Sequence, residues 1–117
     1  LVPGESLPLT EFRDQFTVTA LLLLEDLGFC SKGEAAGFVQ DRHIDPGGDL
    51  PFNTNGGWLS FGQPAIACGM DVIIEAIRQL RGEALGLQVR APRTALVHAV
   101  CGSMACHAVA ILSTEPA

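Results

Sequence analysis

The sequence predicts an α/β domain in which a strand, a helix, a long loop, a second helix and two further strands follow one another. Three observations support this order. The hydrophobic pattern has a strand-like alternation near residues 7–12, a helical period near 17–27 and 67–81, and short β-rich runs after Thr94. The chain has 117 residues, which suits one small domain. Its hydrophobic content of 48% is enough to fill a core, so the composition argues against disorder.

The three predicted strands are short. Leu7–Phe12 alternates apolar and polar residues, as a half-buried strand does. Residues 94–100 and 107–112 are rich in β-branched and aliphatic side chains, which favours two further strands. The dipeptide Gly102-Ser103 between these two strands predicts a hairpin or a tight bend.

Both predicted helices have recognisable ends. In the first, near 17–27, Thr17 can cap the N-terminus and Gly28 can end the helix. Its apolar residues cover most of the circumference, so we expect it to be largely buried. The second helix, near 67–81, has Gly82 as a stop and a polar side that includes Glu75. Its predicted inner face consists of Met70, Ile73, Ile77 and Leu80.

A long loop separates the two helices. From Phe29 to Gly57 the sequence contains turn signals but no sustained period, and so long an irregular segment is usually functional. The loop leads into Asn53–Pro64, which is dense in Gly, Asn and Pro. Because Gly lets a ligand approach the main chain, and because sites are often built on loops, this segment is the predicted functional site.

The charge pattern excludes several kinds of partner. The net charge is −6, and the seven Lys and Arg residues are scattered. Nucleic acids and anionic membranes require clustered cations, so neither partner is expected. The longest apolar run, Val18–Leu24, is too short to span a bilayer. No export signal is recognisable, which predicts a cytoplasmic location.

The four cysteines do not have the spacing of a zinc site, and no metal is predicted. A disulfide framework is not expected either, because an apolar chain of this size does not need one. We therefore expect reduced, mostly buried thiols. The cysteines are Cys30, Cys68, Cys101 and Cys106.

Five segments carry longer motifs, namely Phe12–Thr17, Leu24–Glu34, Asn53–Pro64, Glu75–Glu83 and Ala95–Leu112. In this order they resemble the C-terminal end of thiolases. The resemblance is strongest to the sterol-carrier-protein type and to lipid-transfer-like relatives. It implies a thiolase-like C-terminal half-domain over residues 1–117, an acyl-CoA thioester as substrate and no other cofactor.

The resemblance also implies four catalytic positions. The nucleophilic cysteine of a thiolase belongs to the N-terminal half, and no cysteine of this chain corresponds to it. The histidine of the Gly-His-Pro motif is replaced by Gln63, which can donate hydrogen bonds but cannot exchange protons near neutral pH. The position of a catalytic Asn or His falls on Arg13, which is permanently charged. The second cysteine falls on Ala99, which places Cys101 at a glycine position, although a shift of two residues would align Cys101 itself.

The candidate catalytic residues are therefore Gln63 and Cys101, and the candidate substrate-binding residues are Arg13, Gly62 and Gly102. Each of the larger side chains has two interpretations.

Gln63 either polarises a thioester carbonyl or ties down its own turn. Arg13 either binds an acidic ligand group or a CoA phosphate or, as we favour, forms a surface ion pair with Asp14. Cys101 is either reactive or, as we favour, buried and inert. Trp58 either lines a substrate tunnel or, as we favour, is buried against the second helix.

Three functions follow. The first is the C-terminal region of an acyl-CoA acyltransferase or lipid-transfer-type protein that handles CoA thioesters. The second is a non-catalytic binding or assembly module. The third is part of a retro-aldolase that acts on side-chain CoA thioesters with a zinc-ribbon/OB-fold partner. The resemblance implies tyrosines as the acid–base groups of that retro-aldolase, and this chain contains no tyrosine. By itself, the chain is predicted to lack thiolytic activity.

The resemblance implies that the chain requires other strands. In the family, the strand at Leu7–Phe12 and the strand at Thr94–Val100 are not direct neighbours, because strands from the preceding part of the protein lie between them. We therefore expect the chain to function as a homodimer or together with an N-terminal half.

Overall fold

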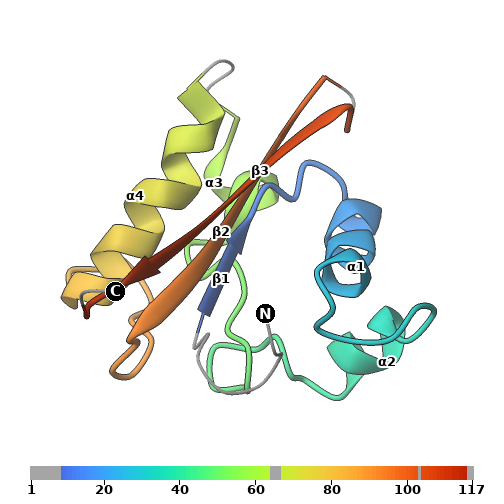
Figure 1. Ribbon diagram of the computed structural model, residues 1–117. Coiled ribbons are helices and arrows are strands. Elements are labelled where there is room, and N and C mark those ends of the chain that lie inside the picture. The colour runs from blue at the N-terminus through green and yellow to red at the C-terminus, as the bar shows by residue number, and fades with distance from the viewer. Residues whose placement is uncertain (1–8, 64–66, 103, 116–117) are drawn as a thin grey trace.

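A computed structural model describes residues 9–63, 67–102 and 104–115 (Figure 1). In chain order its elements are β1 (Leu9–Phe12), α1 (Thr17–Asp26), α2 (Ala35–Gln40), α3 (Gly57–Phe61), α4 (Cys68–Arg81), β2 (Thr94–Cys101) and β3 (Cys106–Ser113). The predicted α/β class is confirmed, and each predicted strand and helix is present. Leu7 and Pro8 of the first predicted strand lie outside the described residues.

The sheet has the order β1-β2-β3. β1 runs parallel to β2, with Leu9 opposite Ala95, and β2 runs antiparallel to β3 along its whole length. The prediction that other strands separate β1 from β2 is therefore wrong for this chain. The backbone groups of β1 must be paired when they are buried, and β2 supplies these partners directly.

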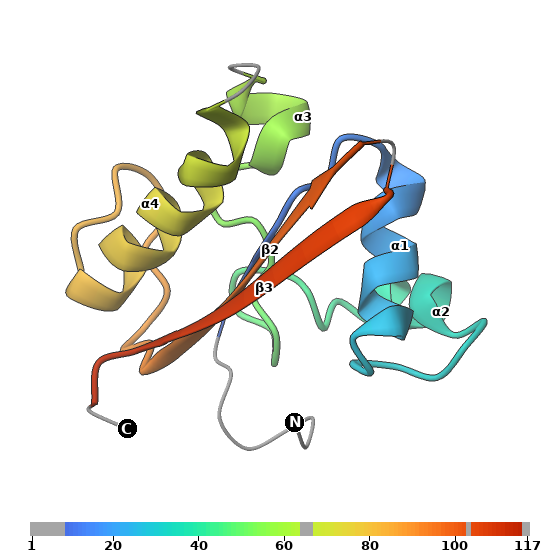
Figure 2. The same cartoon turned by 45° about the horizontal axis from the view of Figure 1, so that its top comes forward.

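The helices cover both faces of the sheet (Figures 1 and 2). α4 packs on one face, where Val72 and Ala76 join Ala95 and Val97 of β2 in one hydrophobic cluster. α1 and α2 lie on the other face, where a second cluster contains Leu96 of β2. Since neighbouring strand residues point to opposite faces, β2 supplies both clusters by alternation. The second cluster consists of Phe12, Leu23, Leu24, Ala35, Leu50 and Leu96.

α1 is less buried than its sequence suggests. Thr19, Leu23 and Leu24 are buried, whereas Val18 and Leu22 are exposed. The expectation of a largely buried helix is therefore wrong, because only one side of α1 faces the sheet. Thr17 does not cap the helix either. It is the first helical residue, and no side chain caps α1.

α4 has the predicted length, and part of its predicted inner face is confirmed, since Ile73 and Leu80 pack against the hydrophobic cluster on the sheet. It ends at Gly82, whose φ of 72° favours glycine. Val72 and Ala76 are buried, together with Glu75 and Gln79, while Met70 is exposed. Glu75 therefore does not belong to the solvated side, as the sequence had indicated. Residues 72, 75, 76 and 79 also follow a helical period, and the sheet selects this face of α4.

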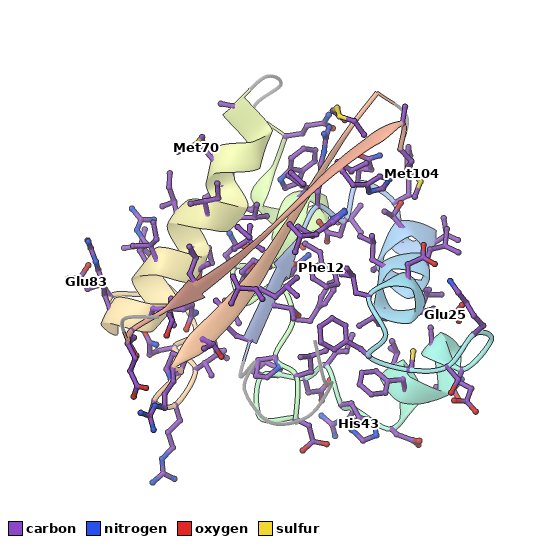
Figure 3. All side chains as sticks on the ribbon, viewed as in Figure 1. Phe12, Glu25, His43, Met70, Glu83 and Met104 are labelled. Atoms are coloured by element: carbon purple, nitrogen blue, oxygen red, sulfur yellow. A yellow bond between two sulfur atoms is a disulfide. The ribbon has the colours of Figure 1, made fainter. Side chains whose placement is uncertain are left out.

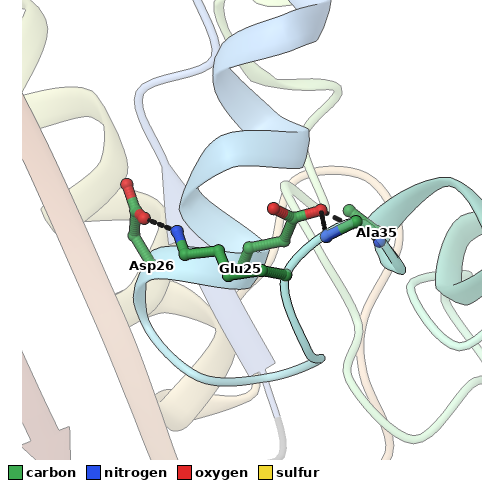
Figure 4. A network of polar contacts seen from close by, with 5 residues as sticks. Glu25, Asp26 and Ala35 are labelled. Atoms are coloured by element: carbon green, nitrogen blue, oxygen red, sulfur yellow. Dashed lines mark hydrogen bonds and ion pairs between the residues drawn. The ribbon is translucent and has the colours of Figure 1, made fainter.

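The first part of the long loop is ordered by polar contacts near the end of α1 (Figure 4). Glu25 Oε1 accepts hydrogen bonds from the backbone N–H groups of Gly33 at 3.0 Å and Ala35 at 3.2 Å. Lys32 forms an ion pair with Asp26 in the same turn. The loop therefore contains a short helix, α2, held to α1, where the sequence predicted only irregular structure.

Candidate functional site

Three separate parts of the chain meet at a cavity of about 410 Å³. One wall comes from the segment that joins β1 to α1, one from the end of α3, and one from the tip of the β2–β3 hairpin. The lining residues are Arg13, Gln15, Phe16, Gln63, Cys101, Gly102 and Met104. Four of the five predicted site residues therefore lie around one cavity.

Gly62 is the fifth predicted site residue, and it does not line the cavity. It follows α3 with a φ of 115°, a conformation that side chains other than glycine rarely adopt. Gly62 therefore allows the chain to leave α3 and turn into Gln63. Its contribution to the site is conformational, and it offers no side chain to a ligand.

Arg13 extends the contact between β1 and β2, since its backbone N–H donates to His98 O at 3.2 Å. Its guanidinium carbon lies 4.0 Å from the centroid of the Trp58 ring. A guanidinium at this distance over an indole is stabilised by a cation–π interaction. Trp58 is buried, as expected, but the contact that defines its position in the site is the one with Arg13.

The predicted ion pair between Arg13 and Asp14 is wrong. Asp14 is buried, and its Oδ1 accepts a hydrogen bond from the backbone N–H of Trp58 at 2.7 Å. The Asp14 carboxylate also lies against Gly57, so closely that a side chain at position 57 would collide with it. Asp14 therefore anchors the start of α3, and Arg13 keeps a charge that is not neutralised by its neighbour.

Cys101 and Cys106 lie opposite each other in the β2–β3 register and form a disulfide, drawn in yellow in Figure 3. Their Cα atoms are 5.2 Å apart, which is within the range that a disulfide requires. The expectation that both are reduced and buried is wrong, because Cys101 and Cys106 are both exposed. The spacing of five residues around a tight bend is the sequence signal that indicates this pairing.

Two histidines form a connected pair on the β2–β3 hairpin. His98 Nε2 lies 3.0 Å from His107 Nδ1, and His107 Nε2 lies 3.0 Å from Met104 O. Since a carbonyl only accepts, His107 carries its proton on Nε2, and His98 then donates through Nε2. Burial and the neighbouring His107 lower the pKa of His98 to about 4, so His98 is neutral at pH 7.

A buried polar cluster, defined by Glu11, Thr54, Glu75 and Gln79, supports the loop that leads to α3. Thr54 Oγ1 lies 2.7 Å from Glu11 Oε1 and 3.0 Å from Glu75 Oε1, and it accepts a hydrogen bond from Gln79 Nε2 at 2.8 Å. One hydroxyl has one proton to donate, so the second carboxylate contact requires a proton on a carboxyl group. Burial accordingly raises the pKa of Glu11 to about 7, against the opposing effect of its hydrogen bonds from Thr54.

Asn53 adds a second attachment of the same loop to β1. Its Oδ1 accepts a hydrogen bond from Phe12 N at 2.6 Å, and its backbone N–H donates to Thr10 O at 2.9 Å. Together with the polar cluster, Asn53 fixes the start of the Gly-rich segment. The sequence pointed to this segment but not to Glu11 or Glu75, which were not recognised as buried.

In the part of the chain that the structure describes, no group of three or more His, Cys, Asp or Glu residues could hold a metal ion. Within the same residues, no helix is long and apolar enough to cross a membrane.

Residues 5–114 match the family model described as "Thiolase C-terminal domain-like", so the chain belongs to this family. The predicted resemblance and fold class are confirmed. The chain is 37% identical over 99 residues to "Benzoylsuccinyl-CoA thiolase subunit BbsB" of Thauera aromatica, covering 84% of this chain and 26% of that protein. It is 52% identical over 69 residues to "17-hydroxy-3-oxo-4-pregnene-20-carboxyl-CoA lyase" of Mycobacterium tuberculosis, covering 59% of this chain and 17% of the lyase.

The chain is also similar to a solved structure described as "Ltp2-ChsH2(DUF35) aldolase". The TM-score is 0.73 and the sequence identity is 38%, over 83% of this chain and 24% of the matched chain. Human "Sterol carrier protein 2" is 37% identical over 98 residues, which cover 84% of this chain and 18% of that protein. The chain thus corresponds to between about a sixth and a quarter of the length of these relatives.

Proposed function

We propose that this chain forms the C-terminal part of a protein that binds CoA thioesters at the cavity beside Gln63. The observation that supports the proposal is the convergence of Arg13, Gln63 and the hairpin tip at Cys101 on one cavity. All three parts had been assigned to substrate or catalysis from the sequence. No cofactor other than the CoA thioester is part of the proposal.

Gln63 is proposed to donate a hydrogen bond from its side-chain amide to the thioester carbonyl oxygen. An amide donor stabilises negative charge that develops on this oxygen, and it does so without changing its own protonation. Gln63 cannot take a proton from a thiol or return one. Cys101 has no free thiol while it is bonded to Cys106. The site as described therefore supports binding and polarisation of a thioester, but not thiolysis.

A second function, carbon–carbon cleavage of retro-aldol type, is favoured by two similarities. Relatives described as a lyase and as "Steroid side-chain-cleaving aldolase" are 52% and 48% identical to this chain over 69 residues each. In such a cleavage, a base removes a hydroxyl proton, the carbon–carbon bond breaks, and the thioester carbonyl takes up the electron pair as an enolate. Gln63 suits the last step, since its amide would donate a hydrogen bond to the thioester oxygen on which negative charge develops.

The acid–base groups of this cleavage are proposed to come from outside the chain. The chain contains no tyrosine, and Gln63 does not titrate. We propose that another chain completes the site, either a second copy or a zinc-ribbon/OB-fold protein. The similarity to a structure described as "Ltp2-ChsH2(DUF35) aldolase" supports the second choice.

The test uses the full-length gene product that contains this chain. Acetyl-CoA, butyryl-CoA and a β-hydroxyacyl-CoA with a branched side chain are titrated while thermal unfolding is followed. A ligand that binds only the folded protein raises the unfolding temperature by mass action. Gln63→Ala is expected to reduce this increase, whereas Gln40→Ala on the surface of α2 leaves it unchanged. If no thioester changes the unfolding temperature, the proposed function is wrong.

Turnover separates the two chemistries. Addition of CoA to acetoacetyl-CoA measures thiolysis, and release of a ketone or aldehyde from the β-hydroxyacyl-CoA measures retro-aldol cleavage. We expect no thiolysis, and cleavage only when the completing chain is present. Thiolysis that is abolished by Cys101→Ser would contradict the assignment of Gln63 and make Cys101 the nucleophile.

A further inference from the structure

We propose that the cavity selects CoA thioesters whose acyl group carries a carboxylate, and that Arg13 binds this carboxylate. The proposal rests on the proposed function and adds a class of substrate to it. Among the described residues that line the cavity, Arg13 alone is charged. A single cation in an otherwise neutral cavity gives the site a preference for a negatively charged group.

The Arg13 guanidinium has no anionic partner within the described part of the chain. Its nearest acidic neighbour in sequence, Asp14, is buried and hydrogen-bonded to Trp58 N at 2.7 Å. The ion pairs of the described residues involve other side chains, namely Lys32 with Asp26, Arg42 with Asp45, His43 with Asp49, and Arg93 with Glu115. The charge at Arg13 is therefore available to a ligand.

Trp58 orients this charge. The indole ring covers one face of the guanidinium, with 4.0 Å between Cζ and the ring centroid. This contact holds the guanidinium beside the ring, and the N–H donors of a guanidinium lie in one plane. A planar set of donors matches the two oxygens of a carboxylate better than a lone carbonyl oxygen. An arginine used only for solubility would not need a buried tryptophan beneath it.

The remaining lining residues suit an acyl group. Phe16 and Met104 offer apolar surface, while Gln15 and Gln63 offer amide donors. A cavity of about 410 Å³ is near the lower end of the usual range for ligand sites, so it fits an acyl group and its thioester better than a whole CoA molecule. We therefore infer that Arg13 binds a carboxylate on the acyl group and not a phosphate at the nucleotide end of the ligand.

The test compares pairs of ligands of equal chain length on the full-length gene product. Succinyl-CoA is compared with butyryl-CoA, and glutaryl-CoA with valeryl-CoA, by isothermal titration calorimetry. Free CoA and free succinate are measured alongside. Because a charge-assisted hydrogen bond to a carboxylate is strong, we expect at least one carboxylated thioester to bind on the order of tenfold more tightly than its neutral counterpart.

Arg13→Gln is expected to abolish this preference, because it should weaken the binding of succinyl-CoA by on the order of tenfold more than the binding of butyryl-CoA. Arg13→Lys retains the charge but not the planar set of donors, so it is expected to keep part of the preference. Arg90→Gln, which removes an exposed charge away from the cavity, is the matched control and should leave the preference unchanged. Far-UV circular dichroism verifies that each variant is folded.

Four results would overturn the proposal. Equal affinities for the carboxylated and neutral thioesters would refute the selection while leaving the proposed function intact. An equal loss of affinity for all thioesters and for free CoA in Arg13→Gln would assign Arg13 to a CoA phosphate. Free succinate binding as tightly as succinyl-CoA would show an anion site unrelated to thioesters. No binding of any thioester would refute the proposed function itself.

Discussion

His98 and His107 face each other across the β2–β3 hairpin, with His98 Nε2 3.0 Å from His107 Nδ1. Through His107, the pair connects the buried His98 of β2 to the backbone carbonyl of Met104, a residue that lines the cavity. Because His98 is 1% exposed and His107 is its neighbour, protonation of His98 in the folded protein would place a positive charge at a buried position beside a second imidazole. The folded state therefore disfavours the protonated form of His98.

Because the folded state disfavours protonated His98, we predict that the protein loses stability in acid. The pKa of His98 is lowered from 6.5 to about 4, so the unfolded chain takes up the proton first. The free energy of unfolding therefore falls as pH decreases from 6.5 to about 4, by on the order of 3 kcal/mol. His98→Leu lacks this titratable group, so the stability of the variant relative to the wild type should rise as pH falls across that interval. Urea unfolding at a series of pH values measures the difference, and a constant difference would contradict the prediction.

Glu11 predicts a change of opposite sign. Burial raises its pKa from 4.5 to about 7, so the folded state holds the proton more tightly than the unfolded state. The stability contributed by the protonated form is present below pH 4.5 and is lost as pH rises to about 7, by on the order of 3 kcal/mol. Glu11→Gln should therefore gain stability over the wild type as pH increases. Glu83→Gln removes an equal charge at the surface and should show no such gain.

The disulfide predicts sensitivity to reducing agents. Closing the short loop between Cys101 and Cys106 should stabilise the folded chain by about 2 kcal/mol. Dithiothreitol is therefore expected to lower the unfolding midpoint of the wild type but not that of a Cys101→Ala/Cys106→Ala double variant. Alkylation before reduction, followed by mass spectrometry, tests the bond directly. Labelling of Cys101 in the unreduced protein would show that the bond is absent.

The exposed side of β3 predicts self-association of the isolated chain. Val109 is 48% exposed and Ile111 is 46% exposed, and both lie on the same face of the outer strand. Exposed apolar residues on an edge strand favour pairing with another chain. Sedimentation equilibrium at micromolar concentrations should show species larger than a monomer, and Ile111→Lys should shift them toward the monomer. Gln40→Lys adds the same charge on α2 and should not. A monomeric wild type would refute this prediction.

The sequence predicted those features of the fold that depend on neighbouring residues. The end of α4 at Gly82 and the positions of β2 and β3 follow from local spacing and turn residues. α2 was missed because its six residues are fewer than a hydrophobic period can reveal. The inner face of α4 was predicted only in part, because two sets of residues share the helical spacing. The sheet selects the set that contains Glu75.

The sequence also predicted which segments form the site but not how their side chains pair. Arg13, Gln63 and Cys101 reach one cavity because the ends of β1, α3 and β2 meet there. The pairing of β1 with β2 was wrongly predicted, since strand neighbours depend on which strands are available and not on either strand alone. The role of Asp14 was missed for a similar reason. Its partner, Trp58, lies far away in the chain, so adjacency to Arg13 was misleading.

Two consecutive residues after β1, Arg13 and Asp14, have separate roles: one contacts the ligand cavity and the other holds the surrounding structure. Asp14 holds the framework by fixing the start of α3, and Arg13 faces the cavity. A substitution at position 13 can therefore change what the cavity accepts without moving its walls, whereas a substitution at position 14 disturbs the walls whatever the ligand. Position 13 is the place where ligand preference can diversify at small cost to folding, and a library randomised there samples new specificities on an unchanged scaffold.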